Sequence, residues 1–73
     1  MFSEFRANVK AELDAKAWTY AKLSEKTGIA ENTIKCFMCG ITDSRRVAEK
    51  IADALECVLS YHNGVYTLKK ERS

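Results

Sequence analysis

The chain has 73 residues, 47% hydrophobic residues, no proline and a formal net charge of +2 at pH 7. This length suits one small domain, and this composition argues against a disordered chain. The charge is too small to indicate nucleic-acid binding by itself. The N-terminal part has no apolar run long enough for a signal peptide or a membrane span, so we expect a cytoplasmic protein without membrane contact.

The first predicted element is a helix near the N-terminus. Ser3 has a hydroxyl that suits a helix N-cap. Apolar residues follow at three- and four-residue steps and form one stripe, which consists of Phe2, Phe5, Val9 and Leu13. This pattern predicts an amphipathic helix that packs on the rest of the domain.

Residues 19–40 predict two short helices joined by a tight turn. Thr19 can cap the first helix, and Gly28 can end it in the left-handed conformation. The second helix is expected over about 31–39. Its apolar residues fall on one side, and these are Ile34, Phe37 and Met38. Two helices in this arrangement are typical of a helix-turn-helix.

A fourth helix is predicted from about Ser44 to Glu56, with Asp43 or Ser44 as its cap. Its inward positions recur at helical spacing and are Val47, Ala48, Ile51, Ala52 and Leu55.

The last segment changes to an alternating pattern around Asn63-Gly64, a strong signal for a two-residue hairpin turn. Pairing outward from the turn sets His62 opposite Val65 and Ser60 opposite Thr67. One face of the hairpin is then apolar and consists of Leu59, Tyr61, Tyr66 and Leu68. This face must cover either the helices of its own chain or a second subunit. We expect a dimer contact, in which exposed strand edges can also pair.

These residues together resemble the lambda-repressor-like, Cro-type helix-turn-helix family, also called the XRE family, over about residues 5–55. The resemblance rests on the following positions: Leu23, Ser24, Thr27-Gly28-Ile29, Asn32-Thr33-Ile34, Cys39-Gly40-Ile41, Val47, Ile51, Ala52, Ala54 and Leu55. Two positions depart from the family pattern. Ser24 stands where a small alanine is usual, and Ala30 stands where a capping serine is usual, which should cost about 1 kcal/mol.

The resemblance implies the helix-turn-helix fold and the partner, and the alternating pattern around Asn63-Gly64 adds the hairpin. The fold class is mainly α, a compact four-helix lambda-repressor-like helix-turn-helix domain with a C-terminal β-hairpin. We expect the helix-turn-helix domain over 1–57, the hairpin over 58–68 and a flexible tail over 69–73. The implied partner is double-stranded DNA, bound by a homodimer.

The family's site positions also carry over to this chain. The first residues of its recognition helix face base edges in the major groove, and here these are Glu31, Asn32, Thr33 and Lys35. Backbone phosphates are contacted at the start of the first motif helix and after the second, which here means Thr19, Tyr20, Thr42, Arg45 and Arg46.

Metal binding, redox regulation and catalysis find little support in the sequence. Cys36 and Cys39, with Cys57 and His62, do not match a familiar zinc arrangement, so we expect no metal and no other cofactor. A thiol switch on the second motif helix is the other reading of its cysteines. No catalytic constellation appears, and we expect no enzyme.

The expected function is therefore sequence-specific DNA binding by a small transcriptional regulator, a repressor of the phage or mobile-element type. The main alternative is a protein-interaction module, such as an antitoxin or an inhibitor, on the same fold. A further alternative is a DNA-architectural or recombination accessory factor.

Overall fold

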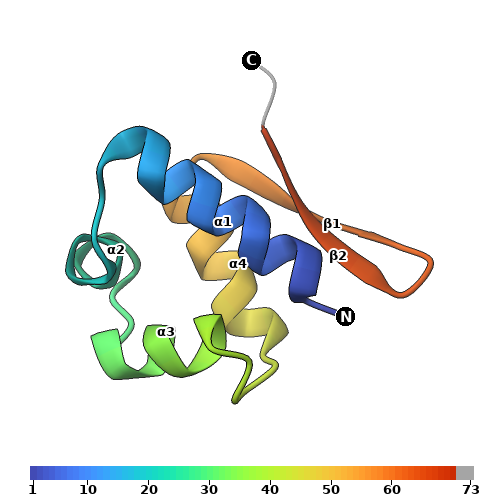
Figure 1. The fold of residues 1–73 in the computed structure, drawn as a ribbon, viewed down its shortest axis with the longest axis horizontal. Helices are drawn as coiled ribbons and strands as arrows, with labels where there is room; N and C mark the ends of the chain where they lie inside the picture. The colour runs from blue at the N-terminus through green and yellow to red at the C-terminus, as the bar shows by residue number, and fades with distance from the viewer. Residues whose placement is uncertain (71–73) are drawn as a thin grey trace.

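The computed structural model describes residues 1–70, in which four helices precede an antiparallel β-hairpin (Figure 1). In chain order the elements are α1 (Ser3–Lys16), α2 (Tyr20–Thr27), α3 (Glu31–Met38), α4 (Arg45–Ala54), β1 (Cys57–His62) and β2 (Val65–Lys70). This helix-rich architecture agrees with the mainly α prediction. Within residues 1–70, none of the helices has the length and apolar character needed to cross a bilayer.

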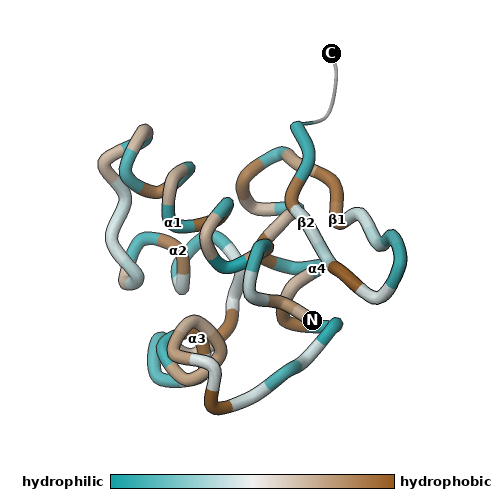
Figure 2. Tube along the Cα trace, turned by 45° about the vertical axis from the view of Figure 1, so that its right-hand side comes forward, coloured by the Kyte–Doolittle hydropathy of each residue, from teal (hydrophilic) through white to brown (hydrophobic). Residues whose placement is uncertain are grey.

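All four helices and the hairpin contribute to one core. The buried residues that form it are Phe2, Phe5, Val9, Leu13, Leu23, Ile34, Phe37, Ala48, Ile51, Leu55 and Cys57. The predicted stripe of α1 is thus confirmed, and Figure 2 shows hydrophobic and hydrophilic residues alternating along the chain trace as this packing requires. The Phe2 ring is central, because it stacks on Tyr66 at 4.3 Å and meets Phe37 edge-on at 5.3 Å between ring centroids.

The hairpin has the predicted register but is longer than predicted. His62 pairs with Val65 across a turn in which Asn63 and Gly64 have φ of 54° and 80°, as a type I′ turn requires. Pairing continues to Cys57 and Lys70. Lys69 and Lys70 therefore belong to β2 and not to a flexible tail, and the remainder of that predicted tail, 71–73, lies outside the described residues.

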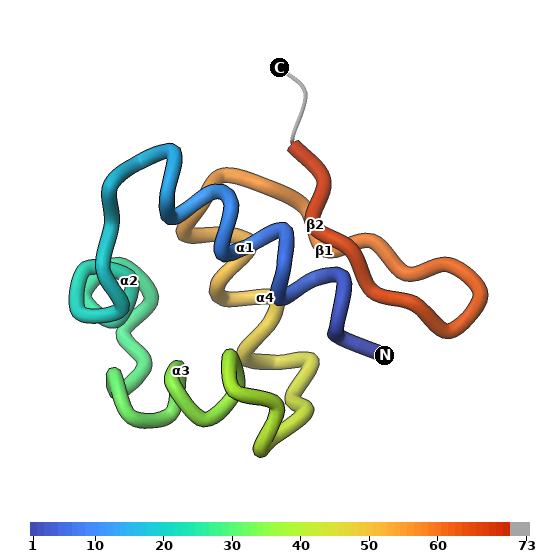
Figure 3. The backbone as a smooth tube through the Cα atoms, viewed as in Figure 1, coloured from blue at the N-terminus to red at the C-terminus, as the bar shows by residue number. Residues whose placement is uncertain are grey.

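Most of the hairpin's apolar face is covered by its own chain. Leu59, Tyr66 and Leu68 are half-buried against the core, whereas Tyr61 remains 59% exposed. For those three residues the chain's own core supplies part of the apolar partner, and the expected dimer contact stays a prediction. The N-terminus lies beside the hairpin (Figure 3), where the Met1 carbonyl accepts a hydrogen bond from the Tyr66 N–H at 2.9 Å.

Two predicted helix ends differ from the structure. Ser3 is the first residue of α1, and its hydroxyl makes no capping hydrogen bond. The fourth helix is shorter than expected: it begins at Arg45, with Ser44 Oγ accepting from the Val47 N–H at 3.3 Å, and it ends at Ala54. Glu56, at φ 59°, turns the chain from α4 into β1.

Candidate nucleic-acid interface

Both ends of α2 have the caps that the sequence predicts. Thr19 Oγ1 accepts a hydrogen bond from the Lys22 N–H at 3.2 Å and so caps the start of α2. At the other end, Gly28 takes the left-handed conformation with φ 77°. Its N–H donates to the Ser24 carbonyl at 2.8 Å, which fixes where α2 ends.

Ser24 also stabilises the α2–α3 turn through a side-chain hydrogen bond. Its hydroxyl donates to the Ile29 carbonyl at 2.5 Å, and Thr27 Oγ1 accepts from the Ile29 N–H at 3.1 Å. Both backbone groups of Ile29 are thereby bonded to side chains of α2. The Ser24 hydroxyl, which the alanine usual at this position would lack, therefore contributes hydrogen bonding to this turn. The local sequence pattern does not reveal this role.

The α3 helix starts without a side-chain cap, as predicted. Ala30 is the N-cap residue, and only its carbonyl takes part, by accepting from the Ile34 N–H at 3.1 Å. The free N–H groups of the first turn are left to solvent or to a ligand. Glu31 places a negative charge at this end of the helix, where the helix dipole favours it.

Burial of Ile34 and Phe37 anchors α3 to the core and leaves the opposite side of the helix exposed. All four predicted base-contacting residues are exposed, and these are Glu31, Asn32, Thr33 and Lys35. Thr33 lies one turn before buried Phe37 and therefore borders the core side of the helix. Asn32 lies on the outer side, where its amide is free to donate and accept.

Two of these residues form an ion pair with each other. Lys35 Nζ lies 3.6 Å from Glu31 Oε2, one helical turn away, and both side chains remain about half exposed. This contact offsets the Lys35 charge in part. Within residues 1–70, Asn32 is an exposed polar residue of the α3 surface that lies outside this ion pair.

The predicted phosphate-contacting residues do not behave alike. Thr19 and Thr42 are exposed, although the Thr19 hydroxyl already serves as a cap, and Tyr20 is half-buried against the core. Arg45 Nε donates to Glu49 Oε2 at 3.1 Å, so its charge is offset within α4. Arg46 is exposed.

Arg46 lies with Lys50 beside the α2–α3 turn. Both line a hollow of about 360 Å³ together with Ser44 and Val47 of the α4 start and Gly28 and Ile29 of the turn. Among residues 1–70 neither cation has a carboxylate within ion-pair distance. Lys50 was not among the residues predicted from the sequence, although its position four residues after Arg46 places it on the same side of the helix.

The loop that follows α3 is held by Arg6 of α1. The Arg6 guanidinium donates to the Thr42 carbonyl at 3.0 Å and to Asp43 Oδ1 at 2.5 Å. The N–H of Ile41 donates to the Cys36 carbonyl at 2.9 Å. This loop carries Thr42 and leads to the basic start of α4, so these contacts position the predicted phosphate-contacting residues.

The cysteines lie at two places in the fold. Cys36 of α3 is half-buried and Cys39, the C-cap residue of the same helix, is exposed, whereas Cys57 is buried at the start of β1. Burial raises the pKa of the Cys57 thiol, and the negative charge of Glu12 adds to this effect. Within residues 1–70, no three His, Cys, Asp or Glu side chains gather as metal ligands would.

The candidate interface thus consists of the outer face of α3 and the Arg46–Lys50 pair beside the turn that precedes it. The two parts are connected by the α2–α3 turn, which Ser24 stabilises, and by the loop after α3, which Arg6 contacts. Comparison of the chain with protein-family models, with curated proteins and with solved structures found no match.

Proposed function

We propose that this chain is a sequence-specific double-stranded DNA-binding regulator with a lambda-repressor-like, Cro-type (XRE) helix-turn-helix fold. The observation that carries the proposal is the exposure of four polar side chains in the first turns of α3, which is anchored from behind by buried Ile34 and Phe37. A short helix with one buried apolar side and one exposed polar side fits the major groove, whose width admits an α-helix.

The chemistry of the α3 surface suits base recognition. The Asn32 amide can bond in two-pronged fashion to adenine N6 and N7. Lys35 can donate to guanine O6 and N7, and Glu31 can accept from the cytosine amino group. Because Lys35 and Glu31 are already paired at 3.6 Å, they would act together, with the carboxylate holding the ammonium in place.

Residues around α3 would bind the DNA phosphates. Arg46 and Lys50 offer two cations beside the α2–α3 turn, and the exposed N-terminus of α2 at Thr19 offers backbone N–H groups. Phosphate contacts of this kind fix the orientation of the recognition helix on the duplex without reading sequence.

The proposed regulator acts as a homodimer by occupying its site and blocking competing proteins. Two α3 helices related by a two-fold axis would read half-sites about one helical turn, roughly 34 Å, apart. The exposed Tyr61 ring is the part of the hairpin's apolar face left for subunit contact.

Selection of binding duplexes from a randomised DNA pool tests the proposal. The wild-type protein should enrich a near-palindrome, and Asn32→Ala should lose preference at one position of each half-site at a cost of about 1–3 kcal/mol. Ser3→Ala is the matched control, because Ser3 is exposed on α1 and makes no capping bond. Failure of the wild-type protein to enrich any sequence would overturn sequence-specific binding.

A further inference from the structure

The two edges of the hairpin differ in how their backbone groups are satisfied. On the β2 edge, the Tyr66 N–H donates to the Met1 carbonyl at 2.9 Å and the Leu68 N–H donates to Asn8 Oδ1 at 3.1 Å. In an antiparallel ladder, successive residues point their N–H groups to opposite sides. These two N–H groups therefore point away from β1, and α1 with the residues before it covers this edge.

The edge of β1 is open. Leu59 lies opposite Leu68 and Tyr61 lies opposite Tyr66. Because the Leu68 and Tyr66 N–H groups point away from β1, the matching backbone groups of Leu59 and Tyr61 point away from β2. Over residues 1–70 no backbone or side-chain group bonds to them on that side.

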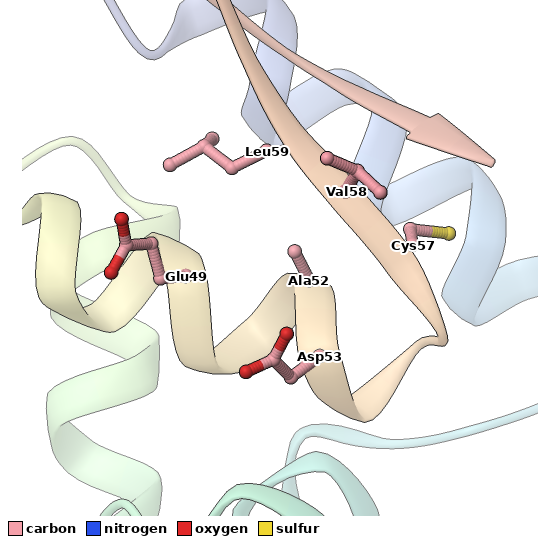
Figure 4. Close-up of a pocket in the computed structure, with 6 residues that line it drawn as sticks. All are labelled: Glu49, Ala52, Asp53, Cys57, Val58 and Leu59. Atoms are coloured by element: carbon pink, nitrogen blue, oxygen red, sulfur yellow. The ribbon is translucent and has the colours of Figure 1, made fainter. Parts of the chain in front are cut away.

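A groove with two carboxylates runs beside this open edge. It has a volume of about 370 Å³ and is lined by Glu49, Ala52 and Asp53 of α4 and by Cys57, Val58 and Leu59 of β1. Figure 4 shows both carboxylates extending from α4, with Val58 and Leu59 extending from the strand. The Glu49 carboxylate is shared with Arg45, whereas Asp53 has no cation within ion-pair distance among the described residues.

We propose that the β1 edge binds an extended, basic peptide segment of a partner protein as a third strand of the sheet. Addition of a strand satisfies the backbone groups of Leu59 and Tyr61, and alternate side chains supply the specificity. Lysine or arginine on the inward side meets Asp53 and Glu49. Apolar, β-branched residues on the outward side meet Val58, which is 46% exposed.

Charge favours this occupant over a second copy of the chain. The β1 strand, Cys57–His62, contains neither lysine nor arginine, so a paired second β1 offers the two carboxylates no such cation. Two-fold pairing would also bring two acidic grooves to the same junction. A basic partner segment, by contrast, neutralises the unpaired Asp53 carboxylate as it binds.

This site is independent of the proposed DNA interface. In Figure 1, α4 begins near α3 and ends where the chain enters β1, so the groove and the outer face of α3 lie at different parts of the molecule. Loss of DNA binding would leave the peptide site intact, and the reverse also holds.

Fluorescence anisotropy with a labelled peptide of about seven residues, in which valine alternates with lysine, tests the proposal. Two further peptides carry N-methyl groups on every second residue: one is methylated at the valines and the other at the lysines. In a bound strand only one of these two sets of N–H groups faces β1. We expect the peptide methylated at that set to bind about tenfold more weakly than the other, a difference of about 1.4 kcal/mol. Equal binding of both methylated peptides would mean attraction by charge alone and would overturn the proposal.

Charge-reversal variants locate the site. Asp53→Lys should weaken binding of the unmodified peptide at least about tenfold. Asp14→Lys makes the same change of charge at an exposed position of α1 and should leave binding nearly unchanged. Equal effects of both variants, no binding at millimolar peptide, or self-association of the wild-type chain that excludes the peptide would each overturn the proposal.

Discussion

Arg6 of α1 donates a hydrogen bond from Nε to the backbone carbonyl of Phe37 in α3, at 2.5 Å. The same guanidinium lies 4.9 Å from the centroid of the Phe37 ring and continues to the Thr42 carbonyl and Asp43. Its side chain is only 17% exposed. One arginine thus ties the first helix to the end of the third and to the loop that carries a predicted phosphate contact.

Arg6→Lys should destabilise the fold, because lysine keeps the charge but cannot donate to three acceptors in a planar fork. We expect a loss of about 1–3 kcal/mol in the free energy of unfolding, measured by urea denaturation. Arg46→Lys is the control, since Arg46 is exposed and makes no ion pair in the described part of the chain. Equal stability of the two variants would contradict this assignment for Arg6.

Ser24→Ala should cost about 1 kcal/mol, because the half-buried Ile29 carbonyl loses its hydroxyl donor. Ser3→Ala removes the cap that the sequence predicted, but no such capping bond exists, so its effect should stay within about 0.5 kcal/mol. Thermal unfolding of both variants gives the comparison. A larger loss for Ser3→Ala than for Ser24→Ala would show that the two hydroxyls have been assigned the wrong roles.

Ala30→Ser should stabilise the protein by about 1 kcal/mol. Ala30 has extended backbone angles, φ −56° and ψ 140°, so a serine hydroxyl there can accept from a free N–H in the first turn of α3. The same substitution at exposed Ala11, inside α1, should be slightly destabilising because serine is the weaker helix former. If the denaturation midpoints of both variants moved in the same direction, the prediction that the N-terminus of α3 lacks a cap would be wrong.

The sequence predicted those features that depend on local pattern. The Asn63-Gly64 turn fixes which residues face each other, so the pairing of Tyr61 with Tyr66 followed from the sequence. Likewise, helical spacing correctly placed Ile34 and Phe37 inside and Asn32 outside.

Features that depend on distant partners were not predicted. Arg6 and the Phe37 carbonyl are 31 positions apart, and no periodicity relates them. The alternation of the hairpin identified an apolar face, but it could not tell whether Leu59 and Leu68 cover the chain's own helices or a partner. Lys50 was overlooked because its proximity to Gly28 arises only when α4 packs against the α2–α3 turn.

If the proposed DNA interface is correct, Arg46→Gln should weaken binding to all duplexes alike. The loss of one phosphate contact should reduce the slope of log affinity against log salt by about 1. Lys69→Gln makes the same change of charge on the hairpin, at an exposed position away from α3, and should leave the slope nearly unchanged. Filter-binding titrations over a range of salt concentrations measure both slopes, and equal slopes for the two variants would exclude Arg46 as a phosphate contact.

The buried thiol of Cys57 should make stability depend on alkaline pH. Burial, aided by the charge of Glu12, raises the thiol pKa above its ordinary value, so the folded chain holds this proton more tightly than the unfolded chain does. The Cys57 contribution is therefore complete below the ordinary thiol pKa and is lost as pH rises through the raised folded-state pKa. Urea midpoints measured from neutral pH upward should fall more steeply for the wild-type protein than for Cys57→Ala. Cys39→Ala, at an exposed position, should keep the wild-type slope, and parallel pH profiles for wild type and Cys57→Ala would contradict the prediction.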